Sequence, residues 1–482
     1  MKAKVMLINP PPSREQITVS DNYFPVGLLY LATVLKASNI DVKIIDIHNY
    51  FYLKEFDQEA LNSYIENNLY RYIKDYRPDI IGIGCPFSGV FNNLKKTASN
   101  IKNIFPQVPI VIGGIHPTAF AADILNKYSH IIDYIILGEG EFSFLELVES
   151  LINNSRTLEA IDGIAFRDKG TIKLNPKTNF ITNLDALPFI DYGVLNIEEY
   201  YNMDTANWYS PKGIRIGQPF PVISSRSCPM RCTFCSMWLT HGTRFRPRSP
   251  ENVLNEMERL YRDYDVRYFQ FMDDNFTFDK KRALGICNGI LKRNMNIEFD
   301  TPNGVAIGRL DAEIIEAMVD AGWVRSGFGI EAGSEYIRNK IMKKGLSTKR
   351  IYEVVEACAK HDHLFMTGFF IIGMPEETHE TLQETYEMIK ELPLDRIGVT
   401  FAAPYPGTEL FNYCIKHNLL RYKAEEYVDV EVFLDTDSYP HFKPHKLTHD
   451  DLISFRKKCN DYMTRKRTAS NLPHNYPLRY RG

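Results

Sequence analysis

Short apolar runs alternate with longer amphipathic stretches over the first third of the chain. Four of these runs are continuously apolar, at residues 5–8, 80–83, 110–112 and 135–137, and a fifth, at 42–45, is interrupted only by Lys43. Buried parallel strands have this pattern, and the stretches between them have the length of crossover helices. The alternation therefore predicts a doubly wound, Rossmann-like α/β domain over residues 1–155.

The second half of the chain repeats the alternation. Strands are expected at 221–225, 268–272, 326–330, 366–372 and 397–401, and helices at 250–264, 312–320, 349–361 and 377–392. This series predicts a (β/α) barrel, complete or a partial TIM barrel, over 216–415, with its active site at the carboxyl ends of the strands. We expect a connector with a small hairpin at 156–215, and a short helical tail at 416–482.

Composition fits a globular protein without a membrane span. The 482 residues are 44% hydrophobic and 24% charged, and 57 Lys+Arg against 60 Asp+Glu give a net charge of −3, which favours neither nucleic acid nor an anionic membrane as partner. No apolar stretch is long enough to cross a bilayer and no signal peptide begins the chain, so we expect a cytoplasmic protein. The basic end, 456–482, is either solvated or recognises a phosphorylated or protein partner.

Three of the eight cysteines form a compact motif. Cys228, Cys232 and Cys235 have C-x3-C-x2-C spacing directly after an expected strand. Thiolates in a reducing compartment suit an iron–sulfur cluster or zinc. Structural zinc needs a fourth protein ligand, such as His241, whereas a [4Fe–4S] cluster held by three cysteines leaves one iron open for substrate. The spacing favours the cluster.

The loops that follow the strands of the first domain are the candidate ligand site there, because open α/β sheets bind ligands at this edge. The candidates are Asn9, Pro10, Pro11, Ser88, Gly89, Gly113, Gly114, His116, Pro117, Gly138, Glu139 and Gly140. For each glycine a tight turn is the alternative explanation. No G-x-G-x-x-G follows the first strand, which disfavours a dinucleotide cofactor.

The first domain resembles the cobalamin-binding domain that is fused to many radical SAM enzymes. The resemblance is carried by NPPP near residue 9, YFPVGLLYLATVLK at 23–36, RPDIIGIG at 77–84, PIVIGGIHPT at 109–118 and IILGEGE at 135–141. It implies that the candidate loops cradle cobalamin. The cobalt-binding motif D-x-H-x-x-G is missing, so no cobalt ligand is assigned. His116 could approach the cofactor, but a lone histidine after two glycines is more often a turn residue bonded to backbone.

The cysteine motif, with Phe234 before its last cysteine, resembles the signature loop of the radical SAM superfamily. The resemblance implies that S-adenosylmethionine binds the open iron and is cleaved to a 5′-deoxyadenosyl radical, with an electron from a low-potential donor such as flavodoxin or ferredoxin. Similar motifs make further residues candidates for binding S-adenosylmethionine: Phe234, Asp273, Asp274, Asn275, Glu331, Gly373 and Pro375. Helix capping is the alternative for 273–275.

The same resemblance indicates a function and two weak substrate contacts. Asn303 lies in a stretch shared with cobalamin-dependent members, and Arg246, with Arg244 and Arg248, either orients a substrate anion or forms a solvated rim. The implied activity is a cobalamin-dependent radical SAM methyltransferase that uses methylcobalamin to methylate an unactivated carbon or phosphorus of a small molecule. A cyclase or ring-rearranging enzyme of this architecture is the alternative, and a cobalamin sensor with structural zinc is the non-enzyme reading.

Overall fold

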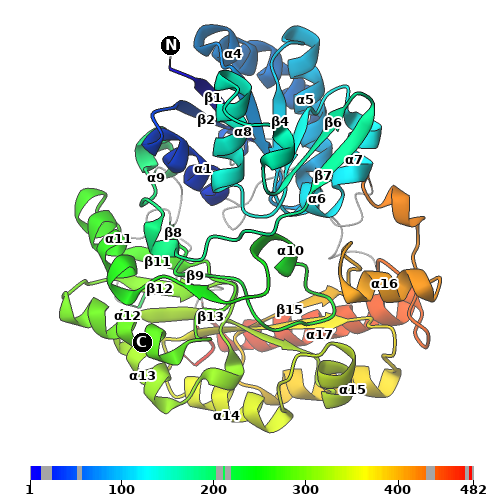
Figure 1. Ribbon diagram of the computed structural model, residues 1–482. Coiled ribbons are helices and arrows are strands. Elements are labelled where there is room, and N and C mark those ends of the chain that lie inside the picture. Colours follow the sequence, from blue (N-terminus) through cyan, green and yellow to red (C-terminus); the bar gives the residue numbers. More distant parts are fainter. Residues whose placement is uncertain are drawn as a thin grey trace.

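The computed structural model describes residues 2–11, 24–51, 57–201, 210–211, 219–429, 440–472 and 477–479, which form two α/β domains (Figure 1). The first domain has a seven-stranded sheet in the order β2-β1-β3-β4-β5-β6-β7. Its parallel strands are β1 (Lys4–Asn9), β2 (Asp41–Asp46), β3 (Ile80–Gly84), β4 (Ile110–Gly113) and β5 (Tyr134–Ile136). All five strands expected in this domain are confirmed.

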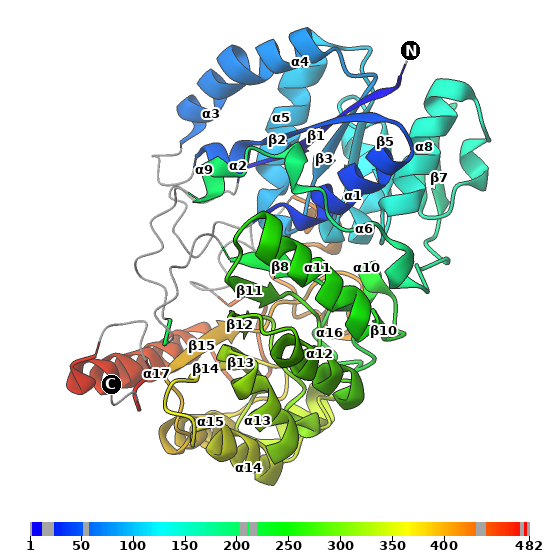
Figure 2. The ribbon, with the colours of Figure 1, turned by 90° about the vertical axis from the view of Figure 1, so that its left-hand side faces the viewer.

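Helices cover both faces of this sheet, because successive strand residues point to opposite faces and apolar residues occupy both faces. Val5 and Leu7 pack against α1 (Val26–Ala37) and α8 (Glu141–Asn153), while Met6 and Ile8 pack on the other face. Figure 2 shows that second face covered by α3 (Gln58–Tyr64), α4 (Tyr70–Tyr76) and α5 (Phe91–Ile104). The carboxyl edge of the sheet is left for the loops.

The expected hairpin is present but belongs to the first sheet rather than to a connector. Strands β6 (Ile164–Asp168) and β7 (Thr171–Asn175) pair with each other, and β6 pairs antiparallel with β5. Ile164, Ala165 and Phe166 are buried by this pairing. The hairpin therefore extends the sheet beyond its parallel part.

The second domain is a partial barrel. Six parallel strands lie in the order β15-β14-β13-β12-β11-β8, without pairing between β15 and β8. They are β8 (Phe220–Val222), β11 (Tyr268–Phe271), β12 (Glu298–Thr301), β13 (Trp323–Glu331), β14 (Phe365–Ile372) and β15 (Arg396–Phe401). The helices outside them are α11 (Pro250–Asp263), α12 (Lys280–Lys292), α13 (Ala312–Asp320), α14 (Thr348–Cys358) and α15 (His379–Glu391).

Strand β12 and helix α12 are absent from the elements expected from the sequence. The strand reads Glu-Phe-Asp-Thr, and its two carboxylates hide the apolar signal, yet Glu298, Phe299 and Asp300 are all buried. Phe299 packs with Phe271 and Phe276 in the core under the helices, so the residues on either side of it face the barrel interior. A strand with charged residues on its inner face does not show the continuous apolar pattern that the search required.

The tail contacts both domains. Helix α17 (His449–Ser470) lies along β15, where Arg456 donates to the Val399 carbonyl at 2.9 Å, and Arg479 pairs with the buried Asp395 at 3.2 Å. Before it, Asp429 pairs with Lys95 at 2.8 Å and Lys127 at 3.2 Å on the first domain. Arg456 and Arg479 thus bind the barrel. Neither interpretation of the basic end, as solvated or as bound to a partner, predicted this. No helix of the described ranges is long and apolar enough to span a membrane.

Candidate functional site

The carboxyl edges of the two sheets meet at the cysteine motif. Helix α6 (Ile115–Ala119), which follows β4, contacts α10 (Trp238–His241), which follows the cysteines (Figure 1). A Cβ atom on Gly138, in the loop after β5, would lie 3.2 Å from the Thr240 carbonyl oxygen. The candidate cobalamin loops and the cysteine loop are therefore direct neighbours.

The cysteine loop, residues 227–237, is firmly held at its ends and middle. Ser227, which precedes Cys228, has a φ of 71°, a left-handed conformation that is strained for a residue with a side chain. Thr233 donates its N–H to the Met342 carbonyl at 3.0 Å and accepts from the Leu410 N–H at 2.9 Å. The loop conformation is thus imposed by the barrel.

The three thiols are unpaired and partly exposed. Among the described residues, no three His, Cys, Asp or Glu side chains converge closely enough to hold one metal ion, and His241 instead bonds Asp274 through Nδ1 at 2.9 Å. A zinc site requires such convergence. A [4Fe–4S] cluster does not, because each thiolate binds a different iron, so the three cysteines fit the cluster better than zinc.

Asp273 and Asp274 hold the backbone around the cysteine loop. Asp273 accepts from the Ser224 N–H, the Ser224 hydroxyl and the Ser225 hydroxyl, each at 2.6 Å. Asp274 accepts from the Ser227 N–H at 2.8 Å. Neither residue caps α12, whose N-cap is Asp279, so the capping alternative is wrong for both. Their carboxylates are already engaged by the protein.

Asn275 is the member of this motif that faces the cysteines. Its Nδ2 lies 3.7 Å from the Cys228 sulfur, and its Oδ1 is buried without a hydrogen-bond partner among the described residues. A buried acceptor without a partner costs free energy, which a bound donor would recover. The amide oxygen is therefore suited to accept from a ligand ammonium at the open iron.

Glu331 and Lys344 form an ion pair beside the cysteines. Glu331 ends β13 with a φ of 70°, and its Oε1 accepts from Lys344 Nζ at 2.6 Å. Burial lowers the pKa of Lys344, but the neighbouring Glu331 and Cys232 raise it more, so its pKa lies above the ordinary value. The sequence leaves two roles open for Lys344, orienting an anion or forming part of a solvated rim. An ammonium group here can bind a carboxylate at the cluster.

Gly373 and Pro375 lie in a turn whose backbone groups are partly occupied. Gly373 has a φ of 87° and donates its N–H to Glu377 Oε2 at 2.5 Å, and the Pro375 carbonyl accepts from the His445 N–H at 3.2 Å. Burial raises the pKa of Glu377 to about 8. Phe234 packs against the apolar cluster that contains Met374. These contacts hold the backbone of the turn in place at the carboxyl end of β14.

In the first domain, several candidate cobalamin-binding residues form hydrogen bonds with other residues of the protein. Asn9 donates to Asp46 at 2.9 Å, and the Pro11 carbonyl accepts from Asn93 at 3.4 Å. His116 is buried, with Nδ1 at 3.0 Å from the Ser88 hydroxyl, and burial lowers its pKa to about 3. The ring also interacts with the Val428 backbone, which raises the pKa against the effect of burial.

Packing within the protein explains one of the glycines in these loops. Gly114 has a φ of 121°, and a Cβ on it would lie 2.2 Å from the Cys85 carbonyl oxygen, so the tight-turn explanation holds for Gly114. Phe87, two residues after Cys85, was not selected from the sequence, yet 56% of its surface is exposed. A large exposed ring at a ligand edge is suited to lie against a flat macrocycle.

The two weak substrate candidates are placed differently. Arg246 is 3% exposed and binds Glu139 of the first domain at 2.8 Å, and Arg248 is buried too, so the solvated-rim interpretation is wrong for both. Arg244 is exposed. Asn303 is exposed and donates to the Met272 carbonyl at 3.1 Å, at the carboxyl end of the barrel.

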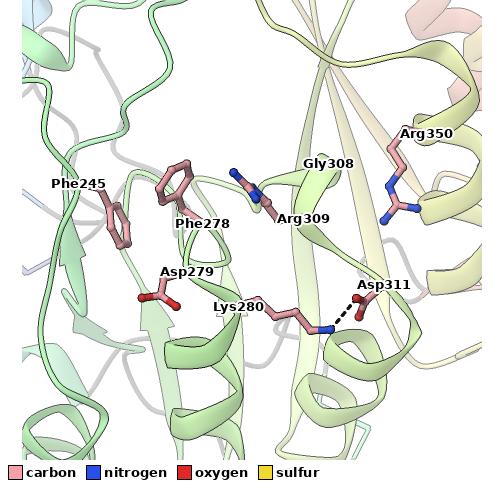
Figure 3. A pocket seen from close by; sticks show the side chains of 8 residues that line it. All are labelled: Phe245, Phe278, Asp279, Lys280, Gly308, Arg309, Asp311 and Arg350. Carbon is pink, nitrogen blue, oxygen red and sulfur yellow. Dashed lines mark hydrogen bonds and ion pairs between the residues drawn. The ribbon is translucent and has the colours of Figure 1, made fainter.

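A separate pocket of about 520 Å³ opens on the rim of the barrel (Figure 3). Within it Lys280 pairs with Asp311 at 2.6 Å, and Arg350 pairs at 3.1 Å with Glu353, which does not line the pocket. Arg309 lies over the Phe278 ring at 5.3 Å. No residue of the cysteine loop lines this pocket, so the chemistry is assigned to the cysteine loop and its neighbours.

The cysteine loop at the top of a partial barrel, below the loop edge of a doubly wound domain, defines a radical SAM enzyme with a cobalamin-binding domain. The family models agree: residues 222–389 match the radical SAM superfamily, and residues 17–148 match the B12 binding domain. The chain belongs to this family of cobalamin-dependent radical SAM enzymes. Its cofactors are those the resemblance implied, a [4Fe–4S] cluster, S-adenosylmethionine and cobalamin.

Relatives and solved structures extend over most of the chain. An uncharacterized methyltransferase of Pyrococcus horikoshii is 32% identical over 459 residues, 94% of this chain and 93% of that protein. The cytidylyl-2-hydroxyethylphosphonate methyltransferase of Streptomyces wedmorensis is 27% identical, over 86% of this chain and 82% of that protein. The methyltransferase TsrM of Kitasatospora setae has the same fold, with a TM-score of 0.70, 17% identity, and coverage of 94% and 84%. The enzyme class expected from the sequence, a methyltransferase, is confirmed.

Proposed function

We propose that the chain transfers a methyl group from S-adenosylmethionine, by way of cobalamin, to an unactivated carbon or phosphorus centre of a small molecule. The observation that carries this proposal is the contact between two cofactor edges: α6 and Gly138 of the cobalamin domain touch α10 directly after the three cysteines. A cobalamin held there lies next to the group that binds S-adenosylmethionine. The methyltransferase relatives support the same conclusion.

The residues around the cysteines bind and orient S-adenosylmethionine in this proposal. Cys228, Cys232 and Cys235 bind three irons, and the cluster, when bound, supplies the electron that cleaves the sulfonium. The Asn275 amide oxygen accepts from the methionine ammonium, and the Lys344 ammonium binds the methionine carboxylate. Glu331 accepts from the ribose hydroxyls, while Phe234, Gly373 and Pro375 line the adenine side.

The loops of the first domain bind cobalamin in this proposal. Their backbone turns at Gly113, Gly114 and Gly138 follow the carboxyl ends of adjacent strands, where open α/β sheets bind ligands. Phe87 and the loop of Ser88 and Gly89 lie at the same edge. His116 is buried and bonded to Ser88, so it holds the loop of Ser88 and Gly89 in place. It is not proposed as a cobalt ligand.

We further propose an external low-potential electron donor, flavodoxin or ferredoxin, and a cytoplasmic location, where the thiols stay reduced. Asn303, exposed at the barrel edge, is the proposed substrate contact. Arg246 is no longer proposed for this role, because Glu139 and two backbone carbonyls occupy its guanidinium. The Streptomyces relative is named for a phosphonate substrate, so the proposed small molecules include phosphonates.

An anaerobic reconstitution tests the proposal. The chain is loaded with iron, sulfide and hydroxocobalamin, and receives S-adenosylmethionine and a low-potential reductant. We expect 5′-deoxyadenosine, S-adenosylhomocysteine and methylated cobalamin together. If a protein with a verified [4Fe–4S] cluster forms neither 5′-deoxyadenosine nor S-adenosylhomocysteine, the proposal is wrong.

The same assay separates the cyclase alternative. An anaerobic magnesium-protoporphyrin IX monomethyl ester cyclase of Rubrivivax gelatinosus is 27% identical over 85% of this chain and 69% of that protein. A cyclase needs no methyl transfer. Production of 5′-deoxyadenosine with bound but unmethylated cobalamin would therefore favour this second class.

A further inference from the structure

A buried cluster of four charges joins the two domains. Glu139 and Glu141 come from the first domain, at the start of α8, and Arg226 and Arg246 come from the second. Each of the four side chains is at most 7% exposed. We call these four residues the interdomain charge cluster.

Its geometry combines one forked pair, Arg246 with Glu139, and one bridging arginine, Arg226. Arg226 donates from Nη1 to Glu139 Oε1 at 3.1 Å and from Nη2 to Glu141 Oε1 at 2.5 Å. Arg246 donates to Glu139 Oε2 at 2.8 Å, and its other Nη lies 2.8 Å from Oε1. Glu139 also accepts from the Ile181 N–H at 2.9 Å. Every charge has an opposite partner, as burial demands.

The charge cluster is directly continuous with both cofactor edges. Glu139 lies between Gly138 and Gly140, in the loop proposed to hold cobalamin. Arg226 belongs to β9 (Ser225–Arg226), which ends two residues before Cys228, and it faces Arg246 across the short pairing with β10 (Arg246–Pro247). One set of hydrogen bonds thus spans from the cobalamin loop to the cysteine loop.

Holding the two domains together does not require a buried charge cluster. Apolar contacts would join two domains at less cost, since each buried charge loses its hydration. Forked bonds between guanidinium and carboxylate are strict about distance and angle, whereas apolar contacts tolerate sliding. Burial opposes ionisation of Glu139, but Arg246 and Arg226 outweigh it, so its pKa lies below the ordinary value and the carboxylate stays charged.

We propose that the interdomain charge cluster sets the distance and angle between cobalamin and S-adenosylmethionine, and that its four members are positioning residues for the methyl transfer between them. In that transfer the sulfonium C–S bond breaks, the electron pair of cob(I)alamin forms the Co–C bond, and S-adenosylhomocysteine leaves. This inference rests on the proposed function. Cleavage of S-adenosylmethionine to 5′-deoxyadenosine needs only the [4Fe–4S] cluster and not cobalamin. Its rate therefore does not depend on the distance between the two cofactors.

The test compares Glu139→Gln with Glu256→Gln in the reconstituted full chain. Glu256 pairs with Arg248 at 2.5 Å and is as deeply buried, but both residues belong to the second domain, so it is a matched control for loss of a buried ion pair. Without substrate, we expect the rate of S-adenosylhomocysteine and methylated cobalamin formation to fall about tenfold to a hundredfold in Glu139→Gln, because small misplacements have effects of this size. The 5′-deoxyadenosine rate stays unchanged, and Glu256→Gln keeps both rates.

A spectroscopic measurement checks the geometry independently of activity. When cob(II)alamin and the reduced [4Fe–4S] cluster are present together, pulsed electron paramagnetic resonance measures the distance between them. We expect one narrow distance in the wild type and in Glu256→Gln, and a broadened one in Glu139→Gln. If Glu139→Gln does not fold, Glu141→Gln takes its place, because Glu141 bonds Arg226 and leaves the Glu139–Arg246 fork intact.

The outcomes separate this inference from the proposed function. A wild type that forms neither nucleoside product contradicts the proposed function itself. An active wild type whose Glu139→Gln variant binds cobalamin, keeps its methylation rate and keeps a narrow distance overturns the positioning role. Equal loss of both product rates in Glu139→Gln and Glu256→Gln also overturns it, because that result is general destabilisation.

Discussion

The two sheets present their carboxyl edges in different ways. At the barrel edge, Ser227, Glu331 and Lys343 all have left-handed φ angles, between 56° and 71°, and the Asn275 oxygen lacks a partner among the described residues. At the edge of the first domain, by contrast, Asn9 and His116 are bonded to the protein's own side chains. One edge holds, beside the cysteines, an acceptor without a partner in the part of the chain that the structure describes, whereas Asn9 and the Nδ1 of His116 at the other edge are bonded to side chains of the protein.

This difference reflects how each cofactor is held. The cluster and S-adenosylmethionine are bound through a few bonds of strict geometry, so the barrel holds strained residues in place for them. A large macrocycle with a nucleotide tail contacts a wide surface, which in the proposed function consists of backbone turns and an exposed ring such as Phe87. Substitutions at the barrel edge should therefore affect activity more than those at the other edge.

The largest effect is expected from Cys235→Ala. Loss of one of three thiolate ligands removes the cluster, so iron content and the cluster's visible absorption fall and 5′-deoxyadenosine formation drops to background. Cobalamin binding, which belongs to the other edge, persists. Cys287→Ala is the control, because Cys287 is buried in α12 and should leave the cluster intact. Retention of a full cluster in Cys235→Ala would contradict the assignment.

A smaller effect is expected from Glu331→Gln. The substitution removes the charge that pairs with Lys344 and weakens the bonds proposed for the ribose hydroxyls. Charge-assisted bonds of this kind are worth about 1.5–3 kcal/mol, so the dissociation constant for S-adenosylmethionine should rise about tenfold to a hundredfold, as measured by equilibrium binding to the reconstituted protein. Glu313→Gln, an exposed carboxylate at the start of α13, should bind normally. Equal affinity in both variants would exclude the ribose role.

The smallest effect, on stability alone, is expected from His116→Gln in the first domain. Burial lowers the pKa of His116 to about 3, with Lys95 and Asp429 as its charged neighbours, so the unfolded chain binds more protons below about pH 6.5. Stability contributed by the neutral ring is therefore lost as pH falls, by up to about 1.4 kcal/mol per pH unit.

Denaturant unfolding of the chain between pH 7.5 and pH 5 measures this slope. His116→Gln should flatten it, while His379→Gln, an exposed histidine, should not. A slope that is the same in all three proteins would show that His116 is not the titrating group. Activity at neutral pH should be nearly equal in His116→Gln and wild type, which sharpens the contrast with the barrel edge.

The sequence predicted those features that depend on local pattern. Apolar runs located the five parallel strands of the first domain, and the cysteine spacing located the centre of the site. Strand β12 was missed because charged residues on its inner face interrupt the apolar pattern. Asp273 and Asp274 were predicted to bind the cofactor, but their partners, Ser224 and Ser227, lie 49 and 47 residues earlier in the chain. Nothing local reveals such a pairing.

The interdomain charge cluster is the clearest case of this limit. Glu139 is separated from Arg226 by 87 residues and from Arg246 by 107, and each reads by itself as a ligand residue or a solvated charge. Their burial depends on how the two domains meet, which no single-chain pattern encodes. Spacing rules find ligands on one loop, while residues that hold two loops together become visible only in the folded structure.

The contacts of Asp429 bear on the order in which the chain matures. The first domain leaves the ribosome early, but the carboxylate that pairs with its Lys95 and Lys127 comes more than 300 residues later. Domains generally fold in the order of synthesis, so this domain first acquires a provisional surface around α5 and α7 (Ala121–Tyr128). Its final packing against Asp429 is completed only when that segment, which is synthesised after all six barrel strands, reaches it.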